Sequence, residues 1–113
     1  MALRHRALPI VGDACGKFRR ELKLFERFEI HTRMLGWDDK WSFVEHRFVK
    51  DQRIIAVVAM RGLFRGPTGK VVPAEFAREL GLDEQSPALP DWLRQWSASC
   101  DGLSLQLRDM ERP

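Results

Sequence analysis

Alternating apolar and polar positions predict a series of β-strands in the first two thirds of the chain. Residues 27–35 place one set of side chains on one side and a polar set on the other: Phe28, Ile30, Thr32 and Met34 against Glu29, His31 and Arg33. A period of two, with aromatic and β-branched residues, is typical of a half-buried strand. Similar runs predict strands at 14–22, 41–49 and 53–65. The near-continuous apolar start of 53–65 indicates a central strand covered on both faces.

Two short polar segments set the order of these strands. "GWDDK" at 36–40 and "KDQR" at 50–53 contain the glycine and aspartate residues that turns favour. They join 27–35, 41–49 and 53–65 into an antiparallel meander. Only a few residues separate strand 14–22 from strand 27–35, so local pattern alone pairs these two strands as a hairpin.

The periodicity becomes helical after residue 72. Pro73 at a first turn and Gly81 beyond a last turn predict a short helix over 73–80. A second short helix is expected over 91–99, where Trp92, Leu93 and Trp96 have helical spacing. Residues 100–113 fit either an edge strand or a helix end. The order of elements predicts an α+β fold with an antiparallel sheet and short C-terminal helices.

Composition and length indicate one soluble domain over residues 1–113. Hydrophobic residues make up 44% of the chain and charged residues 31%, which is ordinary for a globular protein. No apolar run approaches the length of a membrane span, and the N-terminus lacks the apolar segment of a signal peptide. Cys15 and Cys100 show no metal-ligand spacing, so we expect reduced thiols, no metal and no cofactor in a cytoplasmic protein.

Positive charge is concentrated in the first third of the chain. Residues 1–33 carry eight Lys and Arg residues against four Asp and Glu, whereas the remainder is close to balanced. Such a segment can meet phosphate, or can be a solvated strand face. The interspersed glutamates argue against nucleic acid as the partner.

Four segments together resemble the sheet of the hotdog-fold acyl-CoA thioesterases, in particular the 4-hydroxybenzoyl-CoA thioesterase-like branch. They are "FRREL" at 18–22, "FERFEIHTRMLGWDDKWSFVEHRFV" at 25–49, "RIIAVVAMRGLF" at 53–64 and "LPDWLRQW" at 89–96. The resemblance implies an acyl-CoA ligand. It also implies that strand 14–22 lies beside 53–65 rather than beside 27–35.

The resemblance is incomplete at the catalytic motif. In that family a strand, a Gly-His-x-Asn-Asn segment and a long central helix precede this region, and no such segment occurs here. We therefore expect an N-terminally incomplete domain that lacks the central helix. No catalytic residue is carried over, and we expect thioester hydrolysis to be slow or absent.

Several side chains are candidates for chemistry in their own right. His31 and His46 are possible general bases, or surface histidines. Asp38 and Asp39 form either a paired-carboxylate site or a turn cap. Lys17, Arg19 and Arg20 are candidates for binding coenzyme A phosphates, or are a solvated strand edge.

The predicted strands hold more large apolar side chains than two short helices can cover. We therefore expect a homo-oligomer that buries sheet surface between chains, with strand 14–22 as the joining edge. Two functions remain open from the sequence. One is a thioesterase-like protein that hydrolyses or binds acyl-CoA, and the other is a non-catalytic sheet module that acts through assembly.

Overall fold

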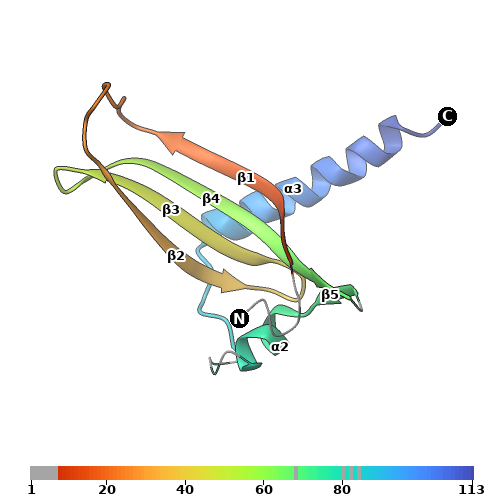
Figure 1. The fold of residues 1–113 in the computed structure, drawn as a ribbon. Coiled ribbons are helices and arrows are strands. Elements are labelled where there is room, and N and C mark those ends of the chain that lie inside the picture. Colours follow the sequence, from red (N-terminus) through yellow and green to blue (C-terminus); the bar gives the residue numbers. More distant parts are fainter. Residues whose placement is uncertain (1–7, 68, 80, 82, 84) are drawn as a thin grey trace.

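The computed structural model describes residues 8–67, 69–79, 81, 83 and 85–113. Within them it contains one five-stranded sheet and two helices (Figure 1). The elements in chain order are β1 Leu8–Phe18, β2 Glu29–Trp37, β3 Ser42–Lys50, β4 Arg53–Gly66, β5 Gly69–Val71, α2 Pro73–Glu79 and α3 Asp91–Met110. This is the predicted α+β, hotdog-like architecture.

The strand order is β1-β4-β3-β2, with every neighbouring pair antiparallel and the short β5 paired to β4. The meander predicted over 27–65 is confirmed as β2, β3 and β4. β1 pairs with β4 and not with β2, as the family resemblance implied. The chain between β1 and β2 therefore passes from one outer strand of the sheet to the other at one end (Figure 1).

The predicted boundaries of the first strand are wrong at both ends. β1 begins at Leu8, because the apolar residues before Asp13 also pair with β4 across a bulge between Val11 and Asp13. It ends at Phe18 and not at residue 22. The N–H groups of Arg19 and Arg20 both donate to the Ile55 carbonyl, so the regular ladder stops there.

Three further boundaries differ from the sequence prediction. β2 continues through Gly36 to Trp37, and the short β5 lies in a segment where no strand was predicted. The tail is helical: α3 has 20 residues and is not short. The first predicted helix is present as α2, and its last expected residue, Leu80, lies outside the described residues.

The first half of helix α3 lies against one face of the sheet, which we call the covered face, and its C-terminal half extends beyond the sheet (Figure 1). Its Leu93 is completely buried against Phe43 of β3 and Ala59 of β4. The surrounding side chains complete this core: Cys15, Leu35, Trp41, Leu89 and Trp96. Close packing of apolar side chains at this contact is the main force that holds α3 on the sheet.

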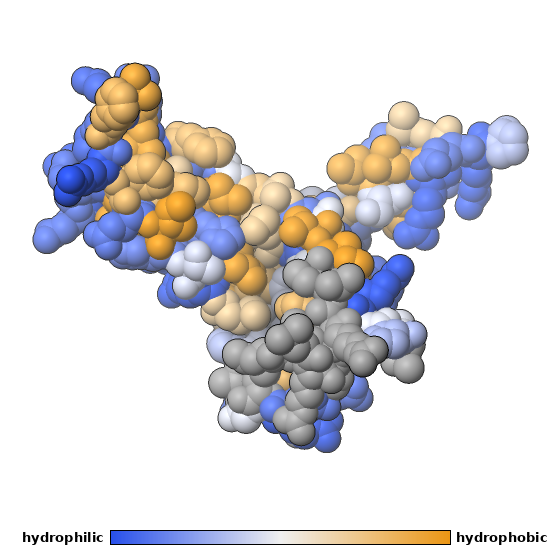
Figure 2. Space-filling model, in the orientation of Figure 1, coloured by the Kyte–Doolittle hydropathy of each residue, from blue (hydrophilic) through white to orange (hydrophobic). Residues whose placement is uncertain are grey.

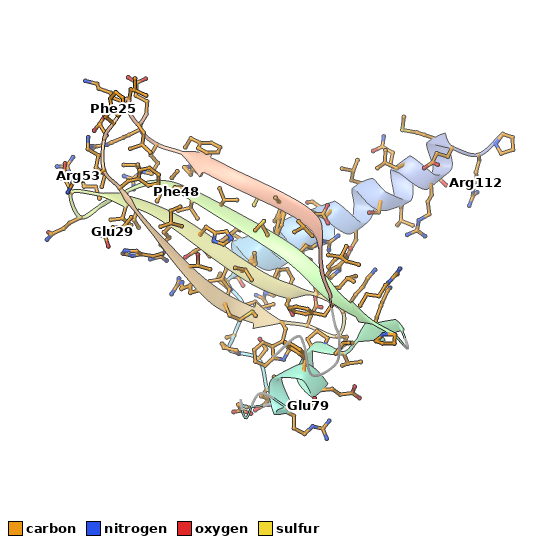
Figure 3. The ribbon with its side chains drawn as sticks, in the orientation of Figure 1. Phe25, Glu29, Phe48, Arg53, Glu79 and Arg112 are labelled. Carbon is orange, nitrogen blue, oxygen red and sulfur yellow. The ribbon has the colours of Figure 1, made fainter. Side chains whose placement is uncertain are left out.

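The opposite face, which we call the open face, is apolar and uncovered in the part of the chain that the structure describes. Phe18 is 76% exposed, Ile30 54% and Met34 50%. The side chains of β2 alternate as predicted. The prediction that one face of this strand is buried is wrong, because its apolar side chains lie on the open face. Figure 2 shows this face with apolar residues spread along the strands. Figure 3 shows Phe48 on the sheet, near the end that carries the exposed Phe25.

Candidate functional site

Strand register aligns the side chains of the covered face in rows across the sheet. One row contains Cys15, Ala59, Glu45 and Arg33, on β1, β4, β3 and β2 respectively. The row on one side holds Asp13, Arg61 and Phe43, and the row on the other side holds Lys17, Val57, Arg47 and His31. The covered face is therefore rich in charged side chains, although α3 lies against it.

Arg61 connects three elements beneath α3. Its side chain is 1% exposed, its Nε donates to Asp13 Oδ2 at 2.6 Å, and its Nη1 donates to Asp101 Oδ1 at 2.9 Å. Nη1 also donates to the Ser97 hydroxyl and carbonyl. Burial lowers the pKa of Arg61, but hydrogen bonds from Arg61 to the two carboxylates outweigh it and the net pKa is raised. Arg61 is a structural cation.

A hollow of about 440 Å³ lies between the covered face and the first turn of α3. We call it the helix-side hollow. Its lining is mainly apolar: Cys15, Gly16, Ile54, Val57, Ala59 and Trp92, joined by Lys17, Arg19 and Glu45. The small Ala59 lies between Cys15 and Glu45 in their row, so it leaves space between those two larger side chains.

Glu45 supplies a buried carboxylate to this hollow. Its side chain is only 6% exposed, and its Oε1 accepts hydrogen bonds from Arg33 Nε at 3.0 Å and Arg47 Nε at 2.5 Å. Two cations thus compensate the buried charge. No described residue donates to the second oxygen, Oε2. The hollow therefore contains a carboxylate that is fixed in place and retains acceptor capacity.

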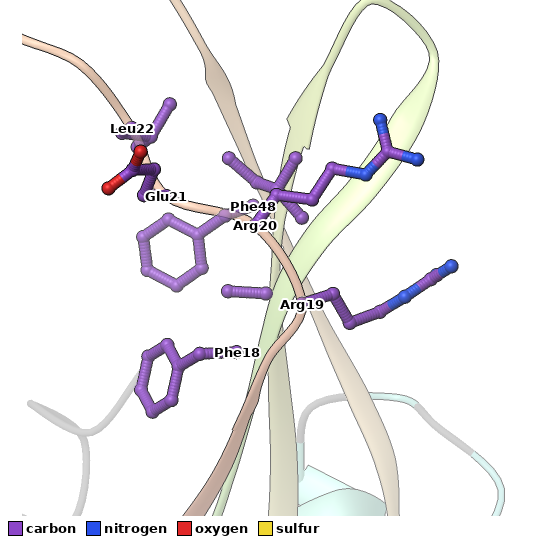
Figure 4. Close-up of a pocket in the computed structure, with 8 residues that line it drawn as sticks. Phe18, Arg19, Arg20, Glu21, Leu22 and Phe48 are labelled. Atoms are coloured by element: carbon purple, nitrogen blue, oxygen red, sulfur yellow. The ribbon is translucent and has the colours of Figure 1, made fainter.

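Lys17 and Arg19 bring positive charge to the same hollow. Among the described residues, neither side chain makes a hydrogen bond or ion pair. Arg20 does not line the helix-side hollow. With Arg19, it borders a different hollow of about 480 Å³ on the open face, beside Phe18 and Phe48. There both arginine side chains extend away from the Phe18 ring (Figure 4).

The thiol of Cys15 is neutral at physiological pH. Burial raises the pKa of Cys15 above its ordinary value of 9.0, although a hydrogen bond with the Ala59 backbone acts in the opposite direction. Burial also raises the pKa of Cys100. Both cysteines are free. They are therefore poor nucleophiles near pH 7.

The structure does not bring the two candidate histidines together. His31 pairs in register with Arg47, which places its neighbour His46 on the opposite face. His31 Nε2 lies 3.3 Å from Glu29 Oε2, and both side chains are exposed. His46 Nδ1 lies 2.7 Å from the Thr32 hydroxyl on the open face. Neither histidine lines the helix-side hollow.

The candidate carboxylates lie in the β2–β3 turn. Asp38 Oδ1 accepts hydrogen bonds from the N–H groups of Lys40 and Trp41, at 2.9 and 2.7 Å. The turn-capping alternative therefore describes the contacts of Asp38. Asp38 and Asp39 also border a polar hollow with Arg61 and Asp101, away from the helix-side hollow.

Sequence reasoning missed Glu45 as a site residue. The available signal was a glutamate inside a mostly apolar strand, with an arginine two residues later. Its burial depends on Arg33 from a neighbouring strand and on α3 above it. Within the described ranges, no cluster of three or more His, Cys, Asp or Glu side chains has the arrangement of a metal site. No helix there is long and apolar enough to cross a membrane.

Comparison with known proteins points consistently to one superfamily. The sequence profile of the thioesterase-like superfamily matches residues 1–97. Protein THEM6 of Xenopus laevis is 41% identical over 95 residues, which cover 81% of this chain and 44% of that protein. The Danio rerio THEM6 is 35% identical over 87% of this chain and 50% of its own length. The chain thus spans about half the length of these relatives.

Two thioesterases also show similarity over smaller parts. The thioesterase poxG of Penicillium oxalicum is 49% identical over 41 residues, which cover 36% of this chain and 14% of that enzyme. The solved structure of a gentisyl-coenzyme A thioesterase superposes with a TM-score of 0.52 at 19% identity. That match covers 64% of this chain and 57% of the other, and it supports the likeness of fold alone.

Proposed function

This chain belongs to the thioesterase-like superfamily, and from that premise we propose that it binds acyl-coenzyme A thioesters in the helix-side hollow. Cations without partners bind phosphate groups, and apolar walls accept the less polar parts of the ligand. The single observation that carries the proposal is the position of Lys17 and Arg19 beside the apolar lining of this hollow. The free thiols are compatible with a cytoplasmic protein.

We propose that binding exceeds turnover. Thioester hydrolysis needs an activated water and a stabilised oxyanion. The two general-base candidates from the sequence, His31 and His46, lie outside the hollow. Asp38 is engaged by the turn that it caps. The family supports acyl-CoA as the ligand class. The positions of His31, His46 and Asp38 favour binding of acyl-CoA without its hydrolysis.

Binding of a non-hydrolysable acyl-CoA thioether, measured by titration calorimetry, tests this function. The double substitution Lys17→Gln and Arg19→Gln is expected to weaken binding about 10-fold or more, because it removes two phosphate-binding cations. Lys70→Gln is the matched control, since this exposed lysine lies on β5, outside the hollow. Absence of binding, or equal loss in the control, contradicts the proposal.

The open face favours a second candidate function, a sheet module that acts through assembly. Phe18, Ile30 and Met34 are large apolar side chains at least half exposed, and continuous apolar surface of this kind commonly marks an interface. The occupant of this candidate is a second copy of the chain, joined through the outer strand β1. The two functions are compatible, because the hollow lies on the covered face.

A further inference from the structure

We propose that the connection between β1 and β2 docks the protein on the surface of a membrane that contains anionic phospholipids. We call residues 20–28 of this connection the tip. Its turn at 23–26 presents two apolar side chains to the lipid, and cations around the turn meet the headgroups. The inference is independent of the proposed function, because it uses neither the helix-side hollow nor the cations that line it.

The two most exposed large apolar side chains of the described residues lie side by side in the tip. Phe25 is 93% exposed and Leu24 is 83% exposed. Turns ordinarily carry glycine, asparagine, aspartate or serine at such positions. Figure 3 shows Phe25 at the far end of the connection, away from both helices. A contact that removes these two side chains from water is therefore favourable.

The backbone of the turn holds the Phe25 ring outward in a conformation that is unfavourable for it. The Glu26 N–H donates to the Lys23 carbonyl at 3.1 Å, which closes a four-residue turn with Leu24 and Phe25 at its centre. Phe25 has a φ of +65°, in the left-handed region that favours glycine. Formation of the turn alone thus does not account for an aromatic residue at this position.

Glu26 fixes the turn to the rest of the sheet. Its Oε1 accepts a hydrogen bond from the Lys23 N–H at 2.7 Å, and its Oε2 pairs with Nζ of Lys50, the last residue of β3. Both carboxylate oxygens are thus engaged. The turn is held in place before any ligand arrives, so a contact with a membrane requires little further ordering of the chain.

Positive charge surrounds the apolar side chains of the tip. Four cations are exposed there: Arg20, Lys23, Arg27 and, from the start of β4, Arg53. Within the described ranges none of their side chains forms a hydrogen bond or an ion pair. Residues 19–29 and 50–53 together carry six Lys and Arg residues against four Asp and Glu. This end of the sheet therefore has a modest excess of positive charge that suits an anionic surface.

The size and shape of the tip favour a lipid surface over a protein partner. Specific protein interfaces bury more than about 1,000 Å² in total, which two side chains on a projecting turn do not provide. A lipid interface accepts a small apolar group, while neighbouring cations pair with phosphate and carboxylate headgroups. Such a contact lies on the membrane and requires no spanning segment. Because the charge excess is modest, we expect binding to need both contributions.

Co-sedimentation with lipid vesicles tests the inference on the unmodified protein. Vesicles of phosphatidylcholine with phosphatidylserine are expected to bind at least about 10-fold more tightly than vesicles of phosphatidylcholine alone, since cations near an anionic surface contribute favourably. Added sodium chloride should weaken this binding, because it screens exposed charges. Equal binding to the two kinds of vesicle, or binding to neither, overturns the inference.

The double substitution Leu24→Ser and Phe25→Gly removes the apolar part of the tip. Glycine is favoured at this φ, so the turn should be retained. Binding to the anionic vesicles is expected to weaken about 10-fold or more. Met110→Ser is the matched control, because it removes another largely exposed apolar side chain at the end of α3, and it should bind within about 2-fold of the unmodified protein. Unchanged binding of the tip variant would leave only general attraction between charges and overturn the inference.

Two further measurements separate the charge and the occupant. The triple substitution Arg20→Gln, Lys23→Gln and Arg27→Gln is expected to remove the preference for phosphatidylserine, and a preference that persists contradicts the role of the tip's cations. Light scattering without vesicles then compares the mass of the tip variant with that of the unmodified protein. We expect the same mass. A lower mass in the tip variant would mean that a second copy of the chain covers the tip, and the membrane proposal would fail.

Discussion

The guanidinium carbon of Arg61 lies 4.1 Å from the ring centre of Trp41, so the most deeply buried cation of the described chain packs against an aromatic face. Trp41 directly follows the β2–β3 turn, and Arg61 reaches from β4 to α3 through Asp101. The contact therefore links the β2–β3 turn, the sheet and helix α3, whose first turn borders the helix-side hollow.

Substitution of Arg61 by Met is expected to destabilise the protein by about 3 kcal/mol. The change keeps much of the side-chain volume but leaves Asp13 and Asp101 without their shared cation. Urea denaturation followed by tryptophan fluorescence measures the loss. Arg53→Met is the control, because Arg53 is exposed at the start of β4. Equal stability of the two variants would show that the buried network contributes little.

Alanine at Gly36 is expected to cost about 2 kcal/mol of stability. Gly36 has a φ of +151°, and an added Cβ would lie 2.5 Å from Ser86 Oγ and 2.7 Å from Leu89 Cδ2. The same change at Gly102 in α3 meets no atom within 4 Å. There, alanine should stabilise by about 1 kcal/mol through helix propensity. Thermal melts of both variants check the opposite signs.

Stability is expected to fall as pH rises above about 9, in part because of Cys15 and Cys100. Burial raises the pKa of both thiols above 9.0 in the folded state. The unfolded chain therefore releases these protons first, and proton loss favours unfolding. Urea midpoints from pH 7 to 10 should decline less steeply in the double variant Cys15→Ser, Cys100→Ser. Parallel curves would contradict the assignment.

The protein is expected to hydrolyse acyl-CoA esters slowly or not at all. Loss of one oxyanion donor alone typically lowers turnover by about 10²–10³-fold, and neither His31 nor Asp38 lies in the helix-side hollow. Free-thiol release from short, long and aromatic acyl-CoA esters measures the activity. Rapid turnover that is lost in His31→Ala or Asp38→Ala would place an active site on those residues.

A homodimer or larger assembly is expected in solution. Apolar side chains on the open face favour burial between chains, at about 1.5–3 kcal/mol for a large side chain. Light scattering after size exclusion measures the mass, and Phe18→Ser with Ile30→Ser should shift it toward the monomer. Both changes lie on the open face and spare the core. A stable, monodisperse monomer of the unmodified chain at micromolar concentration would exclude this assembly.

Local pattern predicted the meander of β2, β3 and β4 and the side of β2 on which each residue lies. It did not predict the position of β1 beside β4, which came from the family resemblance, or what covers each face of the sheet. Ile30 and Met34 do share a face, as the period of two indicates. Their exposure depends on a surface far away in sequence or in another chain, which alternation does not encode. The opposite error applies to Glu45. It was overlooked as a polar strand residue, although Arg33 and Arg47 make its burial possible.

The register between β2 and β3 determines whether the two candidate histidines lie on the same face of the sheet. His31 and His46 lie on neighbouring strands, so the sequence allowed them to share a site. The observed pairing matches His31 with Arg47, and a shift of one residue would have placed both histidines on the same face. Of the three candidate cations, Lys17 and Arg19 border the helix-side hollow and Arg20 does not. That they bind phosphate stays a prediction.

The unequal faces of the sheet give folding and association different responses to salt. Ion pairs of Arg61 and Glu45 lie beneath α3, where mobile ions screen them less than they screen surface charges. Sodium chloride should therefore change the folding equilibrium little. Apolar contact through the open face strengthens when sulfate is excluded from the protein surface. An increase in ionic strength with sulfate thus favours clustering of chains whose internal structure is unchanged.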